Sequence, residues 1–167
     1  MALHEIGHAL GFGASAAWDG LVRNSAQAYE RSNPGSTTFP DAHFAGAAAV
    51  SAFNEIASSY AHGKVPVEND TGTHSESALD NHWRESVLGT ELMSTVLSSS
   101  SEQLSKITIA ALADLGYEVD YTQAEPYTLP AGSTLRLHLH DQVLRDQVHR
   151  GPLPGSAIPH QQIPFIP

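Results

Sequence analysis

The feature that most constrains this chain is the pentapeptide His4-Glu5-Ile6-Gly7-His8, close to its beginning. If the segment is helical, His4 and His8 lie on one face, with Cβ atoms about 5–6 Å apart. Two imidazoles in this arrangement can bind one zinc ion through ring nitrogens at about 2.0–2.1 Å. Glu5 lies one step around the helix, where its carboxylate can accept a proton from a water molecule during attack on a carbonyl. The pattern therefore predicts two zinc ligands and a general base, with chance occurrence of a short motif as the alternative.

A third metal ligand is needed, because a catalytic zinc ion usually takes three protein ligands and leaves one coordination position open. The common metzincin pattern His-Glu-x-x-His-x-x-Gly-x-x-His places the third histidine at position 14, but this chain has Ala14 there, after a matching Gly11. The third ligand must therefore come from farther along the chain. The candidate is His82, and the rival is His74, which lies in a polar loop eight positions earlier.

The composition narrows the classes of partner. The chain has 8 Lys and Arg residues against 18 Asp and Glu, a formal net charge of -10, so a nucleic-acid partner is not expected. Cysteine is absent, which excludes a disulfide framework and a thiolate zinc site and leaves the 10 histidines as soft metal ligands. No apolar run approaches the roughly 20 residues that a membrane-spanning helix needs. The oligomeric state stays open.

Hydrophobic periodicity and the positions of glycines predict the main helices. The first helix ends at Gly11 and Gly13, which suit a left-handed C-terminal turn, and the last ends at Gly116. The predicted helices cover residues 1–13, 43–60 and 101–115.

The remaining segments are predicted to be less regular. Residues 14–41 have a loop-like composition with a short helical turn at 26–29, and residues 117–121 are predicted to form a terminal strand. From residue 129 onward, prolines crowd the chain without sustained periodicity. This composition predicts an extension that is flexible towards its end.

A set of segments forms a more specific pattern than the pentapeptide alone: His4–Phe12, Pro66–Asp70, His82–Glu85, Glu91–Met93 and Asp114–Tyr117. Together they resemble the leishmanolysin-like zinc metalloproteases, a branch of the metzincins. In that family a long insertion separates the helix glycine from the third histidine, which lies shortly before a Glu-Leu-Met turn. The resemblance covers about residues 1–128 of this chain.

Carried over by position, the resemblance implies that His4, His8 and His82 bind zinc, with Glu5 as the general base. Met93, eleven positions after His82, would be the methionine-turn residue, which packs beneath the metal as a thioether without binding it. No comparable turn follows the rival histidine at a matching distance. Without the family, Met93 is a plain core residue, and both interpretations predict that it is buried.

The resemblance also implies the fold class, which is α+β: a metzincin-like zincin fragment that is predominantly helical and lacks the N-terminal sheet subdomain. Residues 1–128 would form the catalytic-domain fragment, with active-site helix, insertion, third-ligand loop, methionine turn and C-terminal helix, and residues 129–167 the extension. Because the motif begins at the fourth residue with no N-cap before it, we expect the chain to be the later portion of a longer protein. The apolar back of the first helix would then be exposed.

The function implied by the resemblance is that of a zinc-dependent endopeptidase, which hydrolyses peptide bonds of a peptide or protein substrate with metal-activated water. Whether the truncated chain is active stays open. The alternative is a non-catalytic truncated relative that binds zinc, or a helical remnant that only binds partners. The resemblance also implies a secreted or cell-surface protein, although the chain shows no recognisable signal peptide.

The other histidines and the acidic residues have simpler interpretations. His43 is expected at the start of a helix and His62 after one, where a cation suits the helix dipole. His138 and His140 alternate, which suits one exposed face of a strand better than a weak metal site. Acidic loop residues could bind calcium but are usually solvated, so no calcium site is predicted; these residues are Glu68, Asp70, Glu85 and Glu91.

Overall fold

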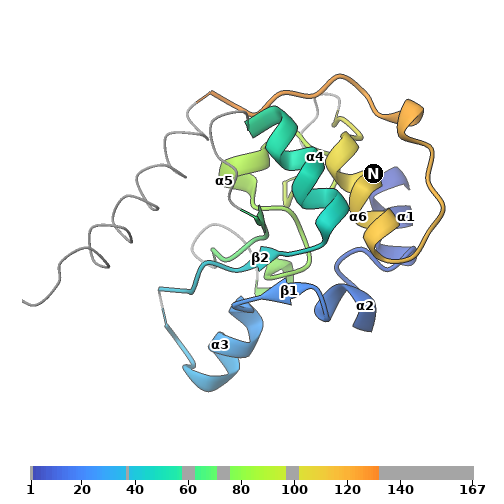
Figure 1. The fold of residues 1–167 in the computed structure, drawn as a ribbon. Helices are drawn as coiled ribbons and strands as arrows, with labels where there is room; N and C mark the ends of the chain where they lie inside the picture. Colours follow the sequence, from blue (N-terminus) through green and yellow to red (C-terminus); the bar gives the residue numbers. More distant parts are fainter. Residues whose placement is uncertain (1, 37, 58–62, 71–75, 97–101, 132–167) are drawn as a thin grey trace, which may run out of the picture.

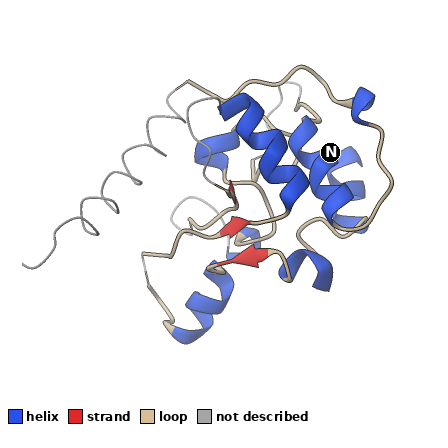
Figure 2. Ribbon diagram, viewed as in Figure 1, coloured by secondary structure: helices blue, strands red, loops and turns tan. Residues whose placement is uncertain are grey.

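The structure is a computed structural model, and it describes residues 2–36, 38–57, 63–70, 76–96 and 102–131. These residues form helices and a small three-stranded sheet, a mixture that is compatible with an α+β fragment (Figures 1 and 2). The longest of the described helices, α4, has 11 residues, so none of them reaches the length of a membrane span. In chain order the elements are α1 (Ala2–Ala9), α2 (Ala16–Asp19), β1 (Val22–Arg23), α3 (Ala26–Ser32), β2 (His43–Phe44), α4 (Ala47–Ala57), β3 (Val65–Pro66), the 3-10 helix η1 (Glu76–Ala78), α5 (Glu85–Leu88), α6 (Lys106–Asp114) and the 3-10 helix η2 (Tyr121–Gln123).

The helices α4 and α6 pack against each other (Figure 1). On α4 the side chains of Ala52 and Phe53 are buried, and on α6 those of Ile107 and Ala111 are buried. Alanine at such positions allows two helices to approach closely, because the distance between helix axes depends on the side chains at the contact. The two helices therefore form a closely packed pair in the core.

The helices α3 and α4 are capped by carboxylates that come from distant parts of the chain. Asp114, at the end of α6, accepts hydrogen bonds from the N–H groups of Ala48 and Ala49 at 3.0 and 2.9 Å. Asp80 does the same for the first N–H groups of α3, at 2.9 and 3.0 Å. Anionic acceptors stabilise helix N-termini, where N–H groups lack partners within the helix. These contacts fix how α3 and α4 are oriented relative to the rest of the fold.

The sheet has the order β1-β2-β3, and both pairings are antiparallel. Phe44 of the central strand lies opposite Val22 of β1 and Val65 of β3. Strands of two residues are too short to be stable on their own, so the sheet depends on the packing around it.

Aromatic rings form the centre of the core, and they come from segments far apart in the sequence. Phe12, Trp18, Phe44 and Trp83 are all fully buried. Their ring centroids are separated by 4.1 Å for Phe12 and Trp18, 4.4 Å for Trp18 and Phe44, and 4.9 Å for Phe12 and Trp83. Aromatic residues bury large apolar areas, and offset or edge contacts at these distances add to that stabilisation. The cluster joins the chain after α1 to the segment that follows His82.

A close approach of two backbones joins the end of the first helix to the same segment. Gly13 has a φ of +67°, and a Cβ atom at this position would lie 2.1 Å from the carbonyl oxygen of Asn81. Both features require glycine, since other residues are strained at positive φ and would collide here. Asn81 directly precedes His82, the candidate third ligand. The contact therefore fixes the position of the backbone that carries His82.

The predicted helices are present, but their ends differ from the prediction. The first helix stops at Ala9, and turns follow it through Gly13. The helix predicted over 43–60 begins at Ala47, because His43 and Phe44 form β2, so His43 does not start a helix. The helix predicted over 101–115 begins at Lys106, after an N-cap formed by the Ser105 side chain.

The segments predicted to be irregular contain more structure than expected. Residues 14–41 include α2, β1 and α3, and the turn expected at 26–29 extends to Ser32. The predicted strand at 117–121 is wrong, because no described strand lies there and the 3-10 helix η2 begins at Tyr121. A strand forms only beside a partner strand, and the local sequence does not reveal whether such a partner lies alongside.

The chain after α6 packs back onto the fold before it leaves the described residues. The hydroxyl of Tyr127 donates to the carbonyl of Leu88 at the end of α5. The carboxylate of Glu125 accepts a hydrogen bond from the N–H of Leu104 at 2.8 Å. Leu129 packs against the core as well. Of the extension predicted at 129–167, residues 132–167 lie outside the described residues, and the boundary at 128 stays a prediction.

Candidate metal centre

Three histidines from two parts of the chain meet at one point. His4 and His8 come from α1, and His82 comes from the loop between η1 and α5. The Nε2 atom of His8 lies 3.1 Å from Nε2 of His4 and 3.2 Å from Nε2 of His82. In the part of the chain that the structure describes, these histidines are the group that could hold a metal ion, with one ligand atom each within 4.8 Å of the others.

The spacing of these nitrogens suits a shared metal ion. Two nitrogens bound at about 2.05 Å to one tetrahedral ion are about 3.3 Å apart, close to the separations in this structure. The pair on α1 is four residues apart, which places both rings on the same side of the helix. His4 is buried, and His8 and His82 are partly exposed. The site therefore has one buried ligand and two partly exposed ones.

The opposite ring nitrogens of the three histidines show the tautomer. A backbone carbonyl can only accept a hydrogen bond, so an Nδ1 atom beside one carries the proton. A neutral imidazole with its proton on Nδ1 presents the lone pair of Nε2. Three such lone pairs directed at one another repel unless a cation lies between them, so the donor set fits a metal. The Nδ1 contacts are His4 with Leu92 at 2.7 Å, His8 with Phe12 at 2.8 Å and His82 with Ala78 at 3.4 Å.

The electrostatics of the site favour neutral imidazole at His82. Burial, followed by repulsion from His8, lowers the pKa of His82 from 6.5 to about 4. A ring with such a pKa is neutral near pH 7 and keeps its lone pair available.

Met93 lies against the helix that carries two of the histidines. Its side chain is fully buried. A Cβ atom added to Gly7 would lie 2.7 Å from the sulfur of Met93 and 2.9 Å from its terminal carbon. The thioether therefore packs directly on the backbone of α1, between His4 and His8 in the sequence. This role of Gly7 was not predicted from the sequence, although a glycine inside a helix is the signal that could have indicated it.

The loop that carries His82 is held on both sides by backbone hydrogen bonds. The carbonyl of His82 accepts from the N–H of Glu68 at 2.9 Å, and the N–H of Trp83 donates to the carbonyl of Met93 at 2.9 Å. The indole N–H of Trp83 also donates to the Thr108 hydroxyl at 2.8 Å. The third histidine is thus positioned by its neighbours on each side, rather than by a helix of its own.

A partly buried ion pair joins this loop to the sheet. Arg84 forms an ion pair with Asp41 at 2.9 Å, and Lys64 forms another with the same carboxylate at 2.6 Å. Burial opposes ionisation of Asp41, but Arg84 and Lys64 outweigh it and lower the pKa of Asp41 from 3.8 to about 2. The carboxylate therefore stays charged and keeps Arg84 in place, two residues after the third histidine.

Two of the acidic residues considered as calcium ligands accept hydrogen bonds from N–H and hydroxyl groups of the protein. Glu68 is buried and accepts from the N–H groups of Asp70 and Glu85, at 2.9 and 3.0 Å, and from the hydroxyl of Thr95 at 3.0 Å. Glu91 is buried in the same way and accepts from neighbouring N–H and hydroxyl groups. These carboxylates are internal acceptors that organise loops, a role that was not predicted from the sequence.

Glu5 lies on α1 between the two histidines, and its side chain is exposed. Its role as the general base stays a prediction. The rival third ligand, His74, lies outside the described residues, and so do three other histidines discussed from the sequence: His62, His138 and His140.

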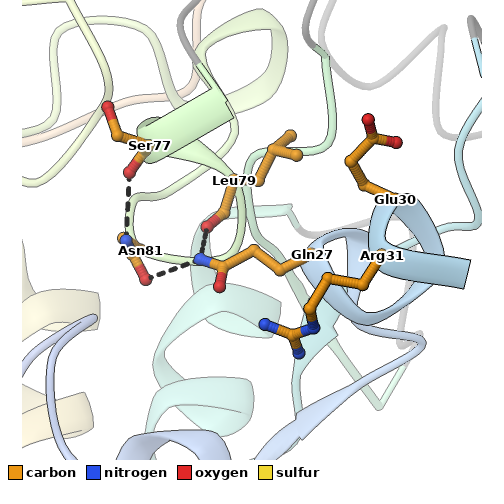
Figure 3. A pocket seen from close by; sticks show the side chains of 6 residues that line it. All are labelled: Gln27, Glu30, Arg31, Ser77, Leu79 and Asn81. Carbon is orange, nitrogen blue, oxygen red and sulfur yellow. Dashed lines mark hydrogen bonds between the residues drawn. The ribbon is translucent and has the colours of Figure 1, made fainter. Parts of the chain in front are cut away.

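A polar pocket lies beside the segment that leads to His82 (Figure 3). It has a volume of about 410 Å³ between α3 and the chain from Ser77 to Asn81. The amide of Gln27 donates to the carbonyl of Leu79 at 2.6 Å, and the amide of Asn81 donates to the carbonyl of Ser77 at 3.0 Å. Because these amides satisfy groups of the pocket itself, they hold the segment in position.

Comparison with known families agrees with the geometry. The model of the leishmanolysin family, peptidase family M8, matches residues 1–150. No curated protein matches the chain, and no solved structure matches it. The match covers most of the 167 residues and includes all three converging histidines. The chain therefore belongs to the leishmanolysin family, a family of zinc-dependent metallopeptidases.

Proposed function

We propose that this chain is the zinc-binding portion of a metzincin-like endopeptidase, with His4, His8 and His82 as the zinc ligands. The observation that carries the proposal is the convergence of three Nε2 atoms, at 3.1 and 3.2 Å from the central one, with each Nδ1 facing a carbonyl. Membership of a metallopeptidase family supports the same assignment.

Each residue of the proposed site has a distinct role. The three histidines would hold the ion. The side chain of Met93 would form an apolar surface beneath the ion and support the backbone of α1. Zinc bound there would supply Lewis-acid chemistry, which polarises a carbonyl and acidifies water. Glu5 would take up, on its carboxylate, the proton released when water adds to a peptide carbonyl, and would return it to the leaving amine.

The substrate class and location follow from the family. A metallopeptidase acts on peptides or proteins, and leishmanolysins are extracellular or attached to the cell surface, so we propose both for this chain. The open side of the site at His8 and His82 is where an extended peptide would enter.

A second candidate function is supported by the surface of α1. Leu3 and Ile6 are each 51% exposed, and Leu10 is 37% exposed. Positions three and four apart on a helix form one stripe, and an exposed apolar stripe is typical of a surface that binds another protein segment. On this alternative the chain binds zinc or a partner without catalysis.

Zinc stoichiometry tests the ligand assignment. The purified chain is expected to bind one zinc ion, and His82→Ala is expected to lose it, because two imidazoles alone bind far more weakly. His43→Ala is the matched control, since His43 lies in β2 and is not part of the converging group. Equal zinc binding by His82→Ala and the unmodified chain would contradict the assignment.

Hydrolysis separates the two candidate functions. An active endopeptidase cleaves casein in a reaction that a chelator stops and that Glu5→Gln abolishes while zinc remains bound. If the chain binds one zinc ion per molecule but does not cleave casein under any of these conditions, the non-catalytic alternative holds.

A further inference from the structure

The turn from Glu91 to Ser94 touches both parts of the proposed metal centre. The carbonyl of Leu92 accepts a hydrogen bond from Nδ1 of His4 at 2.7 Å. The carbonyl of Met93 accepts one from the N–H of Trp83, the residue after His82, at 2.9 Å. Two successive carbonyls of one turn therefore orient His4 on α1 and the loop that carries His82.

The carboxylate of Glu91 holds this turn in place. The residue is 1% exposed, and one of its oxygens accepts a hydrogen bond from the N–H of Met93 at 2.6 Å. The other oxygen accepts from the hydroxyl of Thr108 at 2.6 Å, and from the hydroxyl and the N–H of Ser105 at 2.7 and 3.2 Å. Because Ser105 is the N-cap of α6 and Thr108 lies in its first turn, Glu91 joins the turn to the beginning of that helix.

We propose that Glu91 is a positioning residue of the metal centre, whose buried carboxylate fixes the Leu92 and Met93 carbonyls against α6 and thereby sets the geometry of His4 and His82. The inference rests on the proposed zinc site and deepens it. Glu91 bonds to Met93, Ser105 and Thr108 and not to the ring of His4, His8 or His82, so its effect passes through the backbone of the turn.

The hydrogen bonds explain why a carboxylate is needed at this position. The groups that bond to Glu91 are N–H and O–H donors, and they approach both of its oxygens. Glutamine has the same length but replaces one oxygen with an NH₂ group, which brings two donors face to face. A buried donor without an acceptor is costly, so the turn is expected to move away from the variant side chain.

A second set of hydrogen bonds links the Glu91 carboxylate to the loop that carries His82. The Thr108 hydroxyl donates to Glu91 and also accepts from the indole N–H of Trp83 at 2.8 Å. Trp83 follows His82 directly, and its ring is fully buried in the aromatic cluster. Loss of the Glu91 carboxylate is therefore expected to loosen His82 as well as His4.

The test compares Glu91→Gln with Asp114→Asn. Asp114 also caps a helix from a distant position, but its partners are the N–H groups of Ala48 and Ala49 in α4 rather than those of the turn at Met93. Both variants are expected to lower the unfolding temperature. Zinc affinity is measured by chelator competition with the full chain at a temperature where every variant is folded, and the absorption spectrum of the cobalt(II) form reports ligand geometry.

Glu91→Gln is expected to weaken zinc binding about 10-fold, the lower end for residues that orient metal ligands, and to alter the cobalt spectrum. Asp114→Asn is expected to leave both unchanged. If Glu91→Gln lowers the unfolding temperature but keeps the zinc affinity and cobalt spectrum of the unmodified chain, Glu91 has only a structural role and the inference is wrong.

Variants at Thr108 keep the inference testable if Glu91→Gln does not fold. Thr108→Val removes the hydroxyl that bonds to Glu91 while preserving shape, and Thr108→Ser retains the hydroxyl. The expected result is weaker zinc binding for Thr108→Val than for Thr108→Ser, and equal affinities overturn the inference. If His82→Ala binds zinc as tightly as the unmodified chain, the proposed zinc site is wrong. This result differs from those that contradict only the role of Glu91, so the two failures can be told apart.

Discussion

The two parts of the metal centre are held in place by different means. Helix α1 brings His4 and His8 together through its own hydrogen-bond period, so a stretch of five residues is sufficient. The loop that carries His82 has no such period, and its position depends on contacts with Glu68, Met93 and the backbone at Gly13. The pairing of His4 with His8 is therefore set locally, whereas the position of His82 is only as precise as the long-range packing around it.

The largest effect is expected where the two parts meet. Gly13→Ala would place a Cβ atom 2.1 Å from the carbonyl oxygen of Asn81, at a φ of +67° that alanine tolerates poorly. Because the obstructing atom is backbone, the loop itself must move. We expect a loss of about 3 kcal/mol or more in the free energy of unfolding. Denaturant unfolding measures this, and zinc titration of the folded fraction should show weaker binding through the displaced His82.

Gly35→Ala is the control that separates backbone strain from the close contact. Gly35 has a φ of +78°, and nothing lies within 4 Å of the position of its Cβ. The strain alone is worth about 1 kcal/mol. If Gly35→Ala is as destabilising as Gly13→Ala, the approach of the two backbones is not what holds the loop.

A smaller effect is expected from the ion pair between the sheet and the loop. Because Arg84 and Lys64 lower the pKa of Asp41 from 3.8 to about 2, this carboxylate contributes stability above pH 3.8 that is lost as the pH falls through about 2. Asp41→Asn should therefore cost about 2 kcal/mol at pH 7 and less at pH 2. Urea unfolding at both pH values measures the difference, and an equal loss at both would contradict the assignment.

The contact between α1 and Met93 is expected to have a mixed effect. Gly7→Ala improves the helix propensity of α1 by about 1 kcal/mol but puts a methyl group 2.7 Å from the sulfur of Met93. Since this side chain end is flexible, it can shift, and we expect a net loss of about 1 kcal/mol. The double variant Gly7→Ala with Met93→Ala should relieve the collision, so the two losses are expected to be less than additive in thermal unfolding.

The smallest effect is expected away from both parts of the site. Lys106 and Glu55 form an ion pair at 2.7 Å, with side chains 46% and 55% exposed. Exposed pairs of this kind contribute about 0–1 kcal/mol. Glu55→Gln should change the unfolding midpoint slightly and leave zinc binding unchanged, and a large loss in either quantity would show that α4 and α6 depend on the pair.

Several features of the molecule could be predicted from local patterns. The four-residue spacing of His4 and His8 places both rings on one face if the segment is helical, and the structure has that helix. His82 was a candidate because of its distance from Met93 and the resemblance to a family, not because of any local signal. The helices around residues 50 and 110 were predicted from their apolar faces, whereas their first residues were not.

The features that were missed involve partners that are distant in sequence. The strand at His43 exists because β1 and β3 lie on either side of it, and local periodicity cannot show neighbours. The carboxylates of Glu68 and Glu91 looked like solvated loop residues, because sequence does not reveal that N–H groups surround them. The small size required at Gly7 likewise depends on where Met93 lies.

The amino-acid sequence by itself determined the chemistry of this protein: imidazoles and a carboxylate at helical spacing, no cysteine, and segments typical of the leishmanolysin family. Covalent order and helix geometry suffice for the pair of imidazoles on α1, because His4 and His8 are close in the chain. Only the tertiary structure decided that a third imidazole meets the other two, since its position results from many weak contacts between segments that burial of the aromatic core brings together.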